Sequence, residues 1–454
     1  MLNVSKEAAR LAQQPTDQRL RGLKRIIPCS TVKRILKKCG RDRRFCPRLP
    51  NWFMVWFVLG LGLFCSDCYR QIFRWLQRFR KKIIPGRSTL CEARKRLGLL
   101  PLRLLVNEVV ELLATPKTEH AWYAGMRLMA TDGFVVDLPD TPANVKAFGL
   151  PKGGRTAGAF PQGRVLALCE AGTHVIWRWS IKRLRCGEVR MASYLLSFLQ
   201  PDMLLLWDRN FLSYANVLRV RQRKAHLLAR IKSNLIFHPL RRFPDGSYLA
   251  KLYPSPRARE KDQDGIEVRI IEYTFDDPNR PGAKIRHRLL TTLLDWRAHP
   301  AKRLIVLYHE RWEEELAIDE IKTHQRERPV LRSQTPAGVM QELYGLLLGH
   351  FVIRKLMFEA ANKCGVPPRR LSFTNTLKIL RCRLPEVPKS PSGLKRWYSD
   401  LLAEIGEEIL EPRRDRITPR VIRQKVKKWP KKRPQHRQFP QPRKKIERSI
   451  VMLR

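Results

Sequence analysis

The hydrophobic pattern separates a helical first part of the chain from a strand-rich middle. Up to about residue 118, apolar residues recur at helical spacing among many arginines, which predicts short helices. One of them, 88–98 (STLCEARKRLG), has Ser or Thr as N-cap and Gly as stop. Such short basic helices fit a helix-turn-helix-like DNA-binding unit and a basic helical bundle without base readout equally well.

One apolar segment in this first part has to be weighed as a membrane span. Residues 52–65 (WFMVWFVLGLGLFC) are apolar throughout but only about fourteen in number, and a span needs roughly 20. We therefore expect a buried helix and no transmembrane segment.

The middle of the chain predicts strands. Residues 127–138 and 164–181 are typical of a strand followed by a hairpin that turns at 170–173. The apolar run at 202–209 (DMLLLWDR) is typical of a buried parallel strand, and a helix is predicted at 213–224.

The rest of the chain alternates between strand and helix patterns before it becomes very polar. Within 230–290, segments with alternating apolar and polar residues are separated by turns that contain Pro, Asp and Gly, which predicts a small antiparallel sheet. The run 288–294 predicts a buried strand. Residues 335–361 predict a long apolar helix. From 413 on, Lys, Arg, Pro and Gln dominate, so we expect a disordered basic tail.

The composition points to a polyanionic partner. The 454 residues include 90 Lys and Arg against 41 Asp and Glu, a net charge of +49, which favours nucleic acid over an anionic membrane surface. A hydrophobic content of 43% excludes wholesale disorder. The ten cysteines are irregularly spaced and no secretory signal is evident, which favours a reducing cytosol. The lone CxxC at 65–68 is more typical of helix-packing cysteines than of a zinc site.

The segment 308–322 (YHERWEEELAIDEIK) carries the most specific chemistry. An α-helix turns about 100° per residue, so Glu315 and Lys322 would lie within about 40° of Arg311. Tyr308 would lie about 60° from Arg311 on the same wheel. Such a stripe could hold a divalent metal and grip a polyanion, and a solvated amphipathic helix with i,i+4 ion pairs is the plainer interpretation.

Two aspartates could complete a metal site with Glu315. Asp132 follows the run RLMAT on the first predicted strand, and Asp208 ends the predicted parallel strand, where sites of open α/β sheets form. Three carboxylates suit two Mg²⁺ ions that promote in-line attack at phosphorus. Taken singly, Asp132 could be a turn residue, and Asp208 could form a salt bridge with Arg209.

The spacing Tyr308-x2-Arg311-x3-Glu315-x6-Lys322 resembles the YREK signature of the insertion sequence 4 family of DDE transposases. The resemblance extends over nearly the whole chain, through the segments 131–133 (TDG), 207–211 (WDRNF), 291–294 (TTLL), 331–336 (LRSQTP) and 87–98 (RSTLCEARKRLG).

This resemblance implies an α/β fold: an RNase H-like catalytic core with a β-rich insertion and an N-terminal helical domain. It implies that Asp132, Asp208 and Glu315 are catalytic and bind Mg²⁺, with two ions expected and Mn²⁺ able to substitute. By the same carry-over, Tyr308, Arg311 and Lys322 would contact DNA, and we add Arg209 to that set. The run 312–314 (WEE) is less apolar than the family pattern, which makes Glu314 a possible substitute for Glu315, and Trp296 is a candidate for bracing a flipped base.

The expected domains follow from these patterns. They are a helical N-terminal DNA-binding domain at 1–118, the two parts of the catalytic core at 119–229 and 291–385, a β-rich insertion at 230–290, a C-terminal helical segment at 386–412 and the basic tail at 413–454.

The expected function is that of an insertion-sequence transposase. It would bind terminal inverted repeats, cut the element's ends and join them to target DNA, as a homodimer on double-stranded DNA, in the cytoplasm with the bacterial nucleoid and without a membrane partner. The alternatives are a transposase-derived DNA-binding regulator without catalysis, and a metal nuclease without strand transfer.

Overall fold

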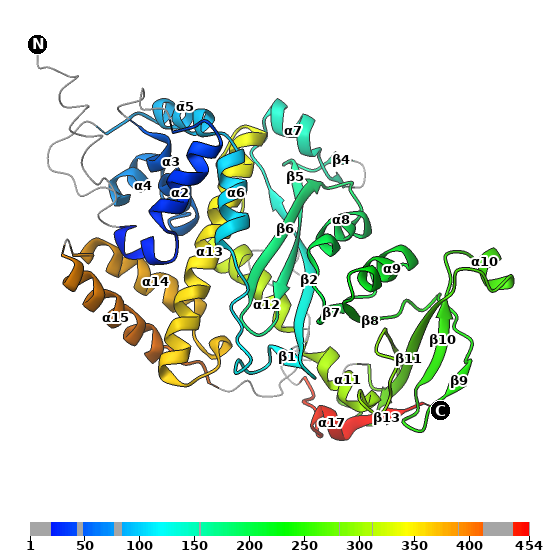
Figure 1. The fold of residues 1–454 in the computed structure, drawn as a ribbon. Helices are drawn as coiled ribbons and strands as arrows, with labels where there is room; N and C mark the ends of the chain where they lie inside the picture. Colours follow the sequence, from blue (N-terminus) through cyan, green and yellow to red (C-terminus); the bar gives the residue numbers. More distant parts are fainter. Residues whose placement is uncertain are drawn as a thin grey trace, which may run out of the picture. The chain divides into compact units, whose positions relative to one another are not determined.

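The computed structural model describes residues 20–42, 49–76, 84–153, 156–280, 282–310, 312–388, 390–411 and 439–453 (Figure 1). They divide into two units: unit 1 consists of Met1–Phe198 and Glu313–Leu410, and unit 2 of Leu199–Trp312 and Glu411–Arg454. The chain therefore crosses between the units in the middle of the segment that carries the YREK spacing.

Unit 1 is centred on two helices that approach very closely. The apolar segment forms α3 (Asn51–Leu63), whose residues from Phe53 to Leu63 are all buried, as predicted. The helix α13 (Pro336–Cys364) packs against it, and a Cβ added to Gly62 would lie 1.9 Å from the carbonyl oxygen of Gly345. Glycine at both positions thus permits backbone contact. Within the described residues, no helix combines the length and the apolarity that crossing a membrane requires.

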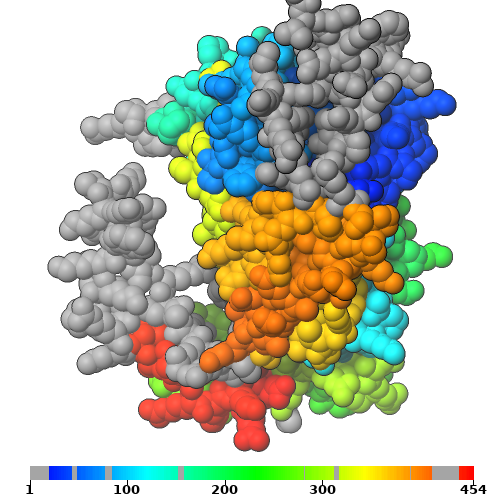
Figure 2. Space-filling view, turned by 90° about the vertical axis from the view of Figure 1, so that its left-hand side faces the viewer, coloured from blue at the N-terminus to red at the C-terminus, as the bar shows by residue number. Residues whose placement is uncertain are grey.

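Shorter helices surround this pair, and those that precede residue 110 confirm the helical pattern predicted for the first part. The surrounding helices are η1 (Leu20–Arg25), α2 (Cys29–Lys38), α4 (Tyr69–Leu76), α5 (Arg87–Leu97), α6 (Leu100–Val109), η4 (Pro368–Arg370), α14 (Phe373–Arg383), η5 (Leu384–Glu386) and α15 (Pro391–Glu407). Figure 2 shows α14 and α15, in orange, at the surface of unit 1. Gly22 of η1 lies against the ring of Trp397 of α15, which joins the start of the described chain to its later helices.

The sheet of unit 1 is antiparallel and confirms the predicted strand and hairpin. The order is β6 (Val175–Arg183), β5 (Gln162–Glu170) and β2 (Met126–Asp137), and β1 (Trp122–Tyr123) pairs with β2. The sequence did not predict the elements between and after these strands. They are α7 (Pro142–Phe148), the pair β3 (Lys152–Gly153) and β4 (Thr156–Ala157), α8 (Glu188–Leu195) and η2 (Leu196–Phe198).

Unit 2 begins with a βαβ element. The strand β7 (Met203–Trp207) is buried at every position and pairs in parallel with β8 (His226–Arg230), after α9 (Tyr214–Gln222). Both the buried parallel strand and the helix are as predicted.

The other strands of unit 2 are antiparallel, as predicted for 230–290 and 288–294. Beyond β8 they follow in the order β12 (His287–Thr291), β11 (Ile266–Phe275), β10 (Tyr248–Leu252) and β9 (Arg241–Arg242). The short helix α10 (Pro256–Glu260) connects β10 to β11, and α11 (Ala301–His309) follows β12.

The prediction of a disordered tail is wrong for its last part, and most of the tail lies outside the described residues. The helix α17 (Ile446–Ser449) leads into β13 (Ile450–Met452), which pairs with β11 through Tyr273 to Phe275. Two backbone N–H groups, of Arg443 and Lys444, donate to the Asp277 carboxylate at 2.7 and 3.0 Å. Pairing with an existing strand orders a segment whose composition alone could not.

Candidate active site

Asp132 lies within the long strand β2 rather than in a turn, so the turn interpretation is wrong. It stands opposite Ala167 of β5, and its neighbour Thr131 is buried. The side chain is half-buried, and the backbone N–H of Gly133 donates to its Oδ1 at 2.8 Å. The strand thus fixes the backbone of Asp132 while leaving part of its carboxylate accessible.

Asp208 follows directly after β7 and is half-buried. Its carbonyl oxygen accepts from the N–H of Phe211 at 3.2 Å, and the Phe211 ring stacks on the buried Trp207 at 5.7 Å. In the described part of the chain no ion pair joins Asp208 to Arg209, so the salt-bridge interpretation gains no support. A buried strand followed by a tight turn presents this carboxylate at the strand's carboxyl end.

Tyr308 secures the same strand end. Its ring is 7% exposed, and its hydroxyl donates to the carbonyl oxygen of Trp207 at 3.2 Å. The contact holds α11 against the residue that immediately precedes Asp208. No sequence pattern indicated this contact, because the two residues are far apart along the chain.

The helix that was expected to carry the YREK stripe is not continuous. The helix α11 ends at His309, α12 spans Trp312–Asp319, and the following turn, η3 (Glu320–Gln325), is a π-helix. The angles predicted between the signature side chains are therefore wrong, because they assumed one continuous α-helix through to Lys322. Lys322 is exposed on η3, whereas Arg311 and the side chain of Glu315 lie outside what the structure describes.

The predicted ligands are distributed over both units. Asp132 and the backbone of Glu315 belong to unit 1, and Asp208 belongs to unit 2. Among the described side chains, which exclude that of Glu315, no group of three or more His, Cys, Asp or Glu residues could hold a metal ion. The meeting of the three carboxylates therefore stays a prediction.

A buried polar cluster in unit 1 adjoins the helix of Glu315, and sequence reasoning missed it. Glu320, at the start of η3, accepts from the Nε of Arg354 at 2.8 Å and from the Nε2 of His350 at 3.0 Å. A second contact joins the Nη2 of Arg354 to the same carboxylate, and the Nδ1 of His174 lies 3.1 Å from it. All four residues are buried.

The charge state of this cluster follows from its burial. Burial lowers the pKa of His350 to about 3, and the charge of His174 acts in the same direction. The carboxylate of Glu320 would favour a charged imidazole, but Arg354 already neutralises it. His350 is therefore neutral and donates through Nε2, and its Nδ1 has no hydrogen-bond partner. An available signal was the pair His350 and Arg354, spaced i,i+4 in the largely apolar middle of α13.

Comparison with known proteins identifies the chain. A family model described as transposase DDE domain matches residues 123–352, and one described as insertion element 4 transposase N-terminal matches residues 17–107. The chain belongs to the insertion sequence 4 family of DDE transposases. It is similar to the transposase InsG for insertion sequence element IS4 of Escherichia coli (strain K12), at 30% identity over 416 residues, which are 88% of this chain and 91% of InsG.

A solved structure also aligns with this transposase. It is the cryo-EM structure of the piggyBac transposase synaptic complex with hairpin DNA, at 13% sequence identity and a TM-score of 0.42, with 87% of this chain and 86% of that chain covered. A likeness at this level adds nothing to the assignment, which depends on the family models and InsG.

Family membership confirms the main predictions made from the sequence. The fold is α/β with an RNase H-like DDE domain and a helical N-terminal region, and the protein is an insertion-sequence transposase, an enzyme that acts on DNA and depends on a divalent metal. The regulator alternative gains no support from these comparisons.

Two further predictions concern residues outside the carboxylate set of the transposase. Trp296 stacks on Phe243 at 6.5 Å in unit 2, and its role on a flipped base stays a prediction. Cys65, the first cysteine of the CxxC, is buried, and its thiol donates toward the carbonyl oxygens of Leu61 and Gly62 at 3.3 Å. These contacts agree with a packing role.

Proposed function

We propose that Asp132, Asp208 and Glu315 together hold two Mg²⁺ ions in this transposase, with Mn²⁺ able to substitute. The observation that carries the proposal is the placement of the two aspartates. Both are half-buried carboxylates held by regular strands, one within β2 and one at the end of β7. Hard oxygen ligands of this kind suit Mg²⁺. Glu315 joins them because its spacing in the YREK signature selects it.

The proposed reaction has two phosphoryl-transfer steps. In the first, a water oxygen loses a proton to solvent and attacks phosphorus at the element's end; the bond to the element's own 3′ oxygen breaks, and this oxygen takes up a proton and becomes a free 3′-hydroxyl. In the second, that 3′-hydroxyl loses its proton to solvent and attacks the phosphorus of a target phosphodiester; the bond to the target's 3′ oxygen breaks, and this oxygen takes up a proton and leaves as a hydroxyl. The bound metal would lower the pKa of the attacking group and stabilise the charge on the departing oxygen.

The cationic residues around the carboxylates would contact the DNA backbone. Arg209 and Lys322 are exposed, and Arg311 completes the signature, so we assign phosphate contacts to these three. Tyr308 is buried and bonded to the backbone before Asp208, so we give it a positioning role rather than the DNA contact first predicted. Its hydroxyl would hold the strand end that presents Asp208.

The N-terminal helices would recognise the terminal inverted repeats of the element. They are short and rich in cations, which suits phosphate contacts beside a groove. Two ends must be joined in one reaction, so we propose a homodimer on double-stranded DNA. Its place would be the cytoplasm, with the bacterial nucleoid.

A cleavage assay with matched variants tests the proposal. With Mg²⁺ and a duplex carrying the element's ends, Asp132→Asn, Asp208→Asn and Glu315→Gln should each abolish cutting and leave end binding within about twofold. The control is Asp140→Asn, which removes an exposed carboxylate near the end of β2 and should cut normally. Loss of cutting by Glu314→Gln with normal cutting by Glu315→Gln would transfer the role to Glu314.

A further inference from the structure

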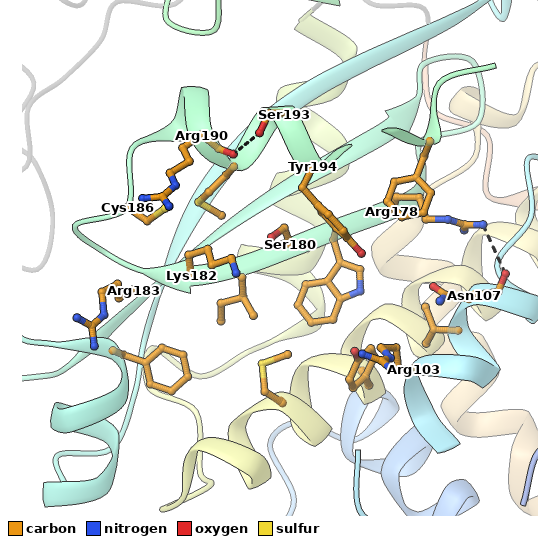
Figure 3. Close-up of a pocket in the computed structure, with 18 of the residues that line it drawn as sticks. Arg103, Asn107, Arg178, Ser180, Lys182, Arg183, Cys186, Arg190, Ser193 and Tyr194 are labelled. Atoms are coloured by element: carbon orange, nitrogen blue, oxygen red, sulfur yellow. Dashed lines mark hydrogen bonds between the residues drawn. The ribbon is translucent and has the colours of Figure 1, made fainter. Parts of the chain in front are cut away.

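A large open pocket in unit 1 combines cations with aromatic rings and contains no carboxylate among its lining residues. Its volume is about 1040 Å³, and its walls come from α6, α7, β6, α8, η2 and α13 (Figure 3). The cations are Arg103, Arg178, Lys182, Arg183, Arg185 and Arg190, and the rings are those of Phe148, Trp177, Trp179, Tyr194, Phe198 and Tyr344.

The cations of this pocket have no anionic partners. Five of the six are exposed, and within the described part of the chain none of the six forms an ion pair. Arg178 is half-buried instead and donates to the carbonyl oxygens of Val110 at 3.2 Å and Asn107 at 3.4 Å. Charges of one sign lining one hollow repel one another and attract a polyanion. The polyanion on which a transposase acts is DNA.

Tyr194 supplies an aromatic surface among these charges. Its side chain is 53% exposed, and its ring packs against that of Phe198 at 5.3 Å with 83° between the planes, which fixes its orientation. In Figure 3 the ring reaches from α8 into the pocket, with Lys182 on one side and Arg178 and Arg103 on the other. A ring held beside several cations is the arrangement on which unpaired bases stack.

We propose that this pocket binds a single DNA strand, with phosphates on the exposed cations and an unpaired base stacked on Tyr194. A duplex fits this chemistry less well, because its bases already stack on each other and its outer surface offers only phosphate, sugar and groove edges to a concave wall. The inference rests on the family's action on DNA and does not depend on which residues bind the metal.

A binding assay in EDTA tests the charge component of the proposal. It measures the affinity of the full chain for fluorescein-labelled oligodeoxythymidylate of twenty nucleotides. The test variant carries Lys182→Gln and Arg190→Gln, and the matched control carries Lys395→Gln and Arg396→Gln, which remove two exposed cations of α15. Each lost phosphate contact makes the negative slope of log K against log salt shallower by about 0.7 for a single strand, so the slope of the test variant should become shallower by about 1.4 and that of the control should not change. Equal changes in both variants would overturn the proposal.

Substitution of Tyr194 tests the stacking component. Tyr194→Ala should weaken oligodeoxythymidylate binding between about fivefold and about 150-fold without changing the salt slope, and Tyr194→Phe should bind normally. Unchanged binding by Tyr194→Ala contradicts the stacked base. If the Lys182 and Arg190 variant weakens binding of a 20-base-pair duplex and leaves the oligonucleotide unaffected, the pocket takes duplex DNA and the proposal is wrong. The assay contains EDTA and therefore no bound metal, so its outcome does not depend on the metal-site assignment.

Discussion

The buried imidazole of His350 should make unit 1 less stable in mild acid. The residue is buried on α13, where Glu320, Arg354 and His174 surround it, and its pKa is lowered from 6.5 to about 3 by burial. The unfolded chain takes up a proton at this site below its ordinary pKa, whereas the folded chain does not. The stability contributed by neutral His350 is therefore fully present above pH 6.5 and is lost as the pH falls from 6.5 toward 3.

The size of the loss follows from the two pKa values. At pH 7 the unfolded imidazole is mostly neutral, so the penalty is small, whereas at pH 5 it reaches about 2 kcal/mol, since each pKa unit is worth about 1.4 kcal/mol. Typical domains are stable by about 5–15 kcal/mol, so this one group would remove a measurable part of the total.

Urea unfolding of the wild type and of His350→Gln at pH 7 and pH 5 measures this contribution. Gln keeps a neutral N–H donor but cannot titrate. Between pH 7 and pH 5, the free energy of unfolding of His350→Gln should therefore fall by about 2 kcal/mol less than that of the wild type. The control is His120→Asn, because His120 is exposed in unit 1 and its φ of 58° suits Asn. An equal pH dependence in the wild type and His350→Gln would refute the assignment of a neutral buried imidazole.

Three other substitutions or reactions test the packing. Gly345→Ala should destabilise unit 1 by about 1–3 kcal/mol in urea unfolding, because the new Cβ would lie 2.2 Å from the carbonyl oxygen of Val58, and an unchanged midpoint would contradict the close helix contact. Burial raises the pKa of Cys65 to about 12, so iodoacetamide at pH 8 should alkylate the exposed Cys68 and spare Cys65 until urea is added, as peptide mass spectrometry would show. Ile450→Ala should cost about 2–5 kcal/mol in unit 2, because Ile450 is 6% exposed on β13, and wild-type stability would speak against that strand.

The strands of this transposase could be predicted from the sequence because their signals are local. The run from Met203 to Trp207 is apolar at every position, which identifies a buried strand without knowledge of its neighbours. The hairpin of β5 and β6 has turn residues between two β-rich runs. In contrast, β13 is only three residues long and pairs with a strand more than 170 residues earlier, so no local pattern could reveal it.

The candidate site could be predicted in its residues but not in its geometry. The spacing of the signature selected Glu315, whereas the break between α11 and α12 and the π-helix at Glu320 depend on contacts made elsewhere. The Glu320 cluster draws on a turn before β6 and on α13, which contribute His174, His350 and Arg354. Likewise, the pocket around Tyr194 gathers cations from α6, β6 and α8, and no single segment shows them together.

Metal-directed cleavage of the protein backbone tests most directly whether the three carboxylates share one metal site. Fe²⁺ would replace Mg²⁺ in the complex of the full chain with end-bearing duplex DNA, and ascorbate with peroxide would then cut the chain next to the bound metal. The account predicts cuts near Asp132, near Asp208 and near Glu315, all of which disappear together in Asp208→Asn. Cuts near Asp132 that persist in Asp208→Asn, or cuts at only one of the three segments, would contradict it.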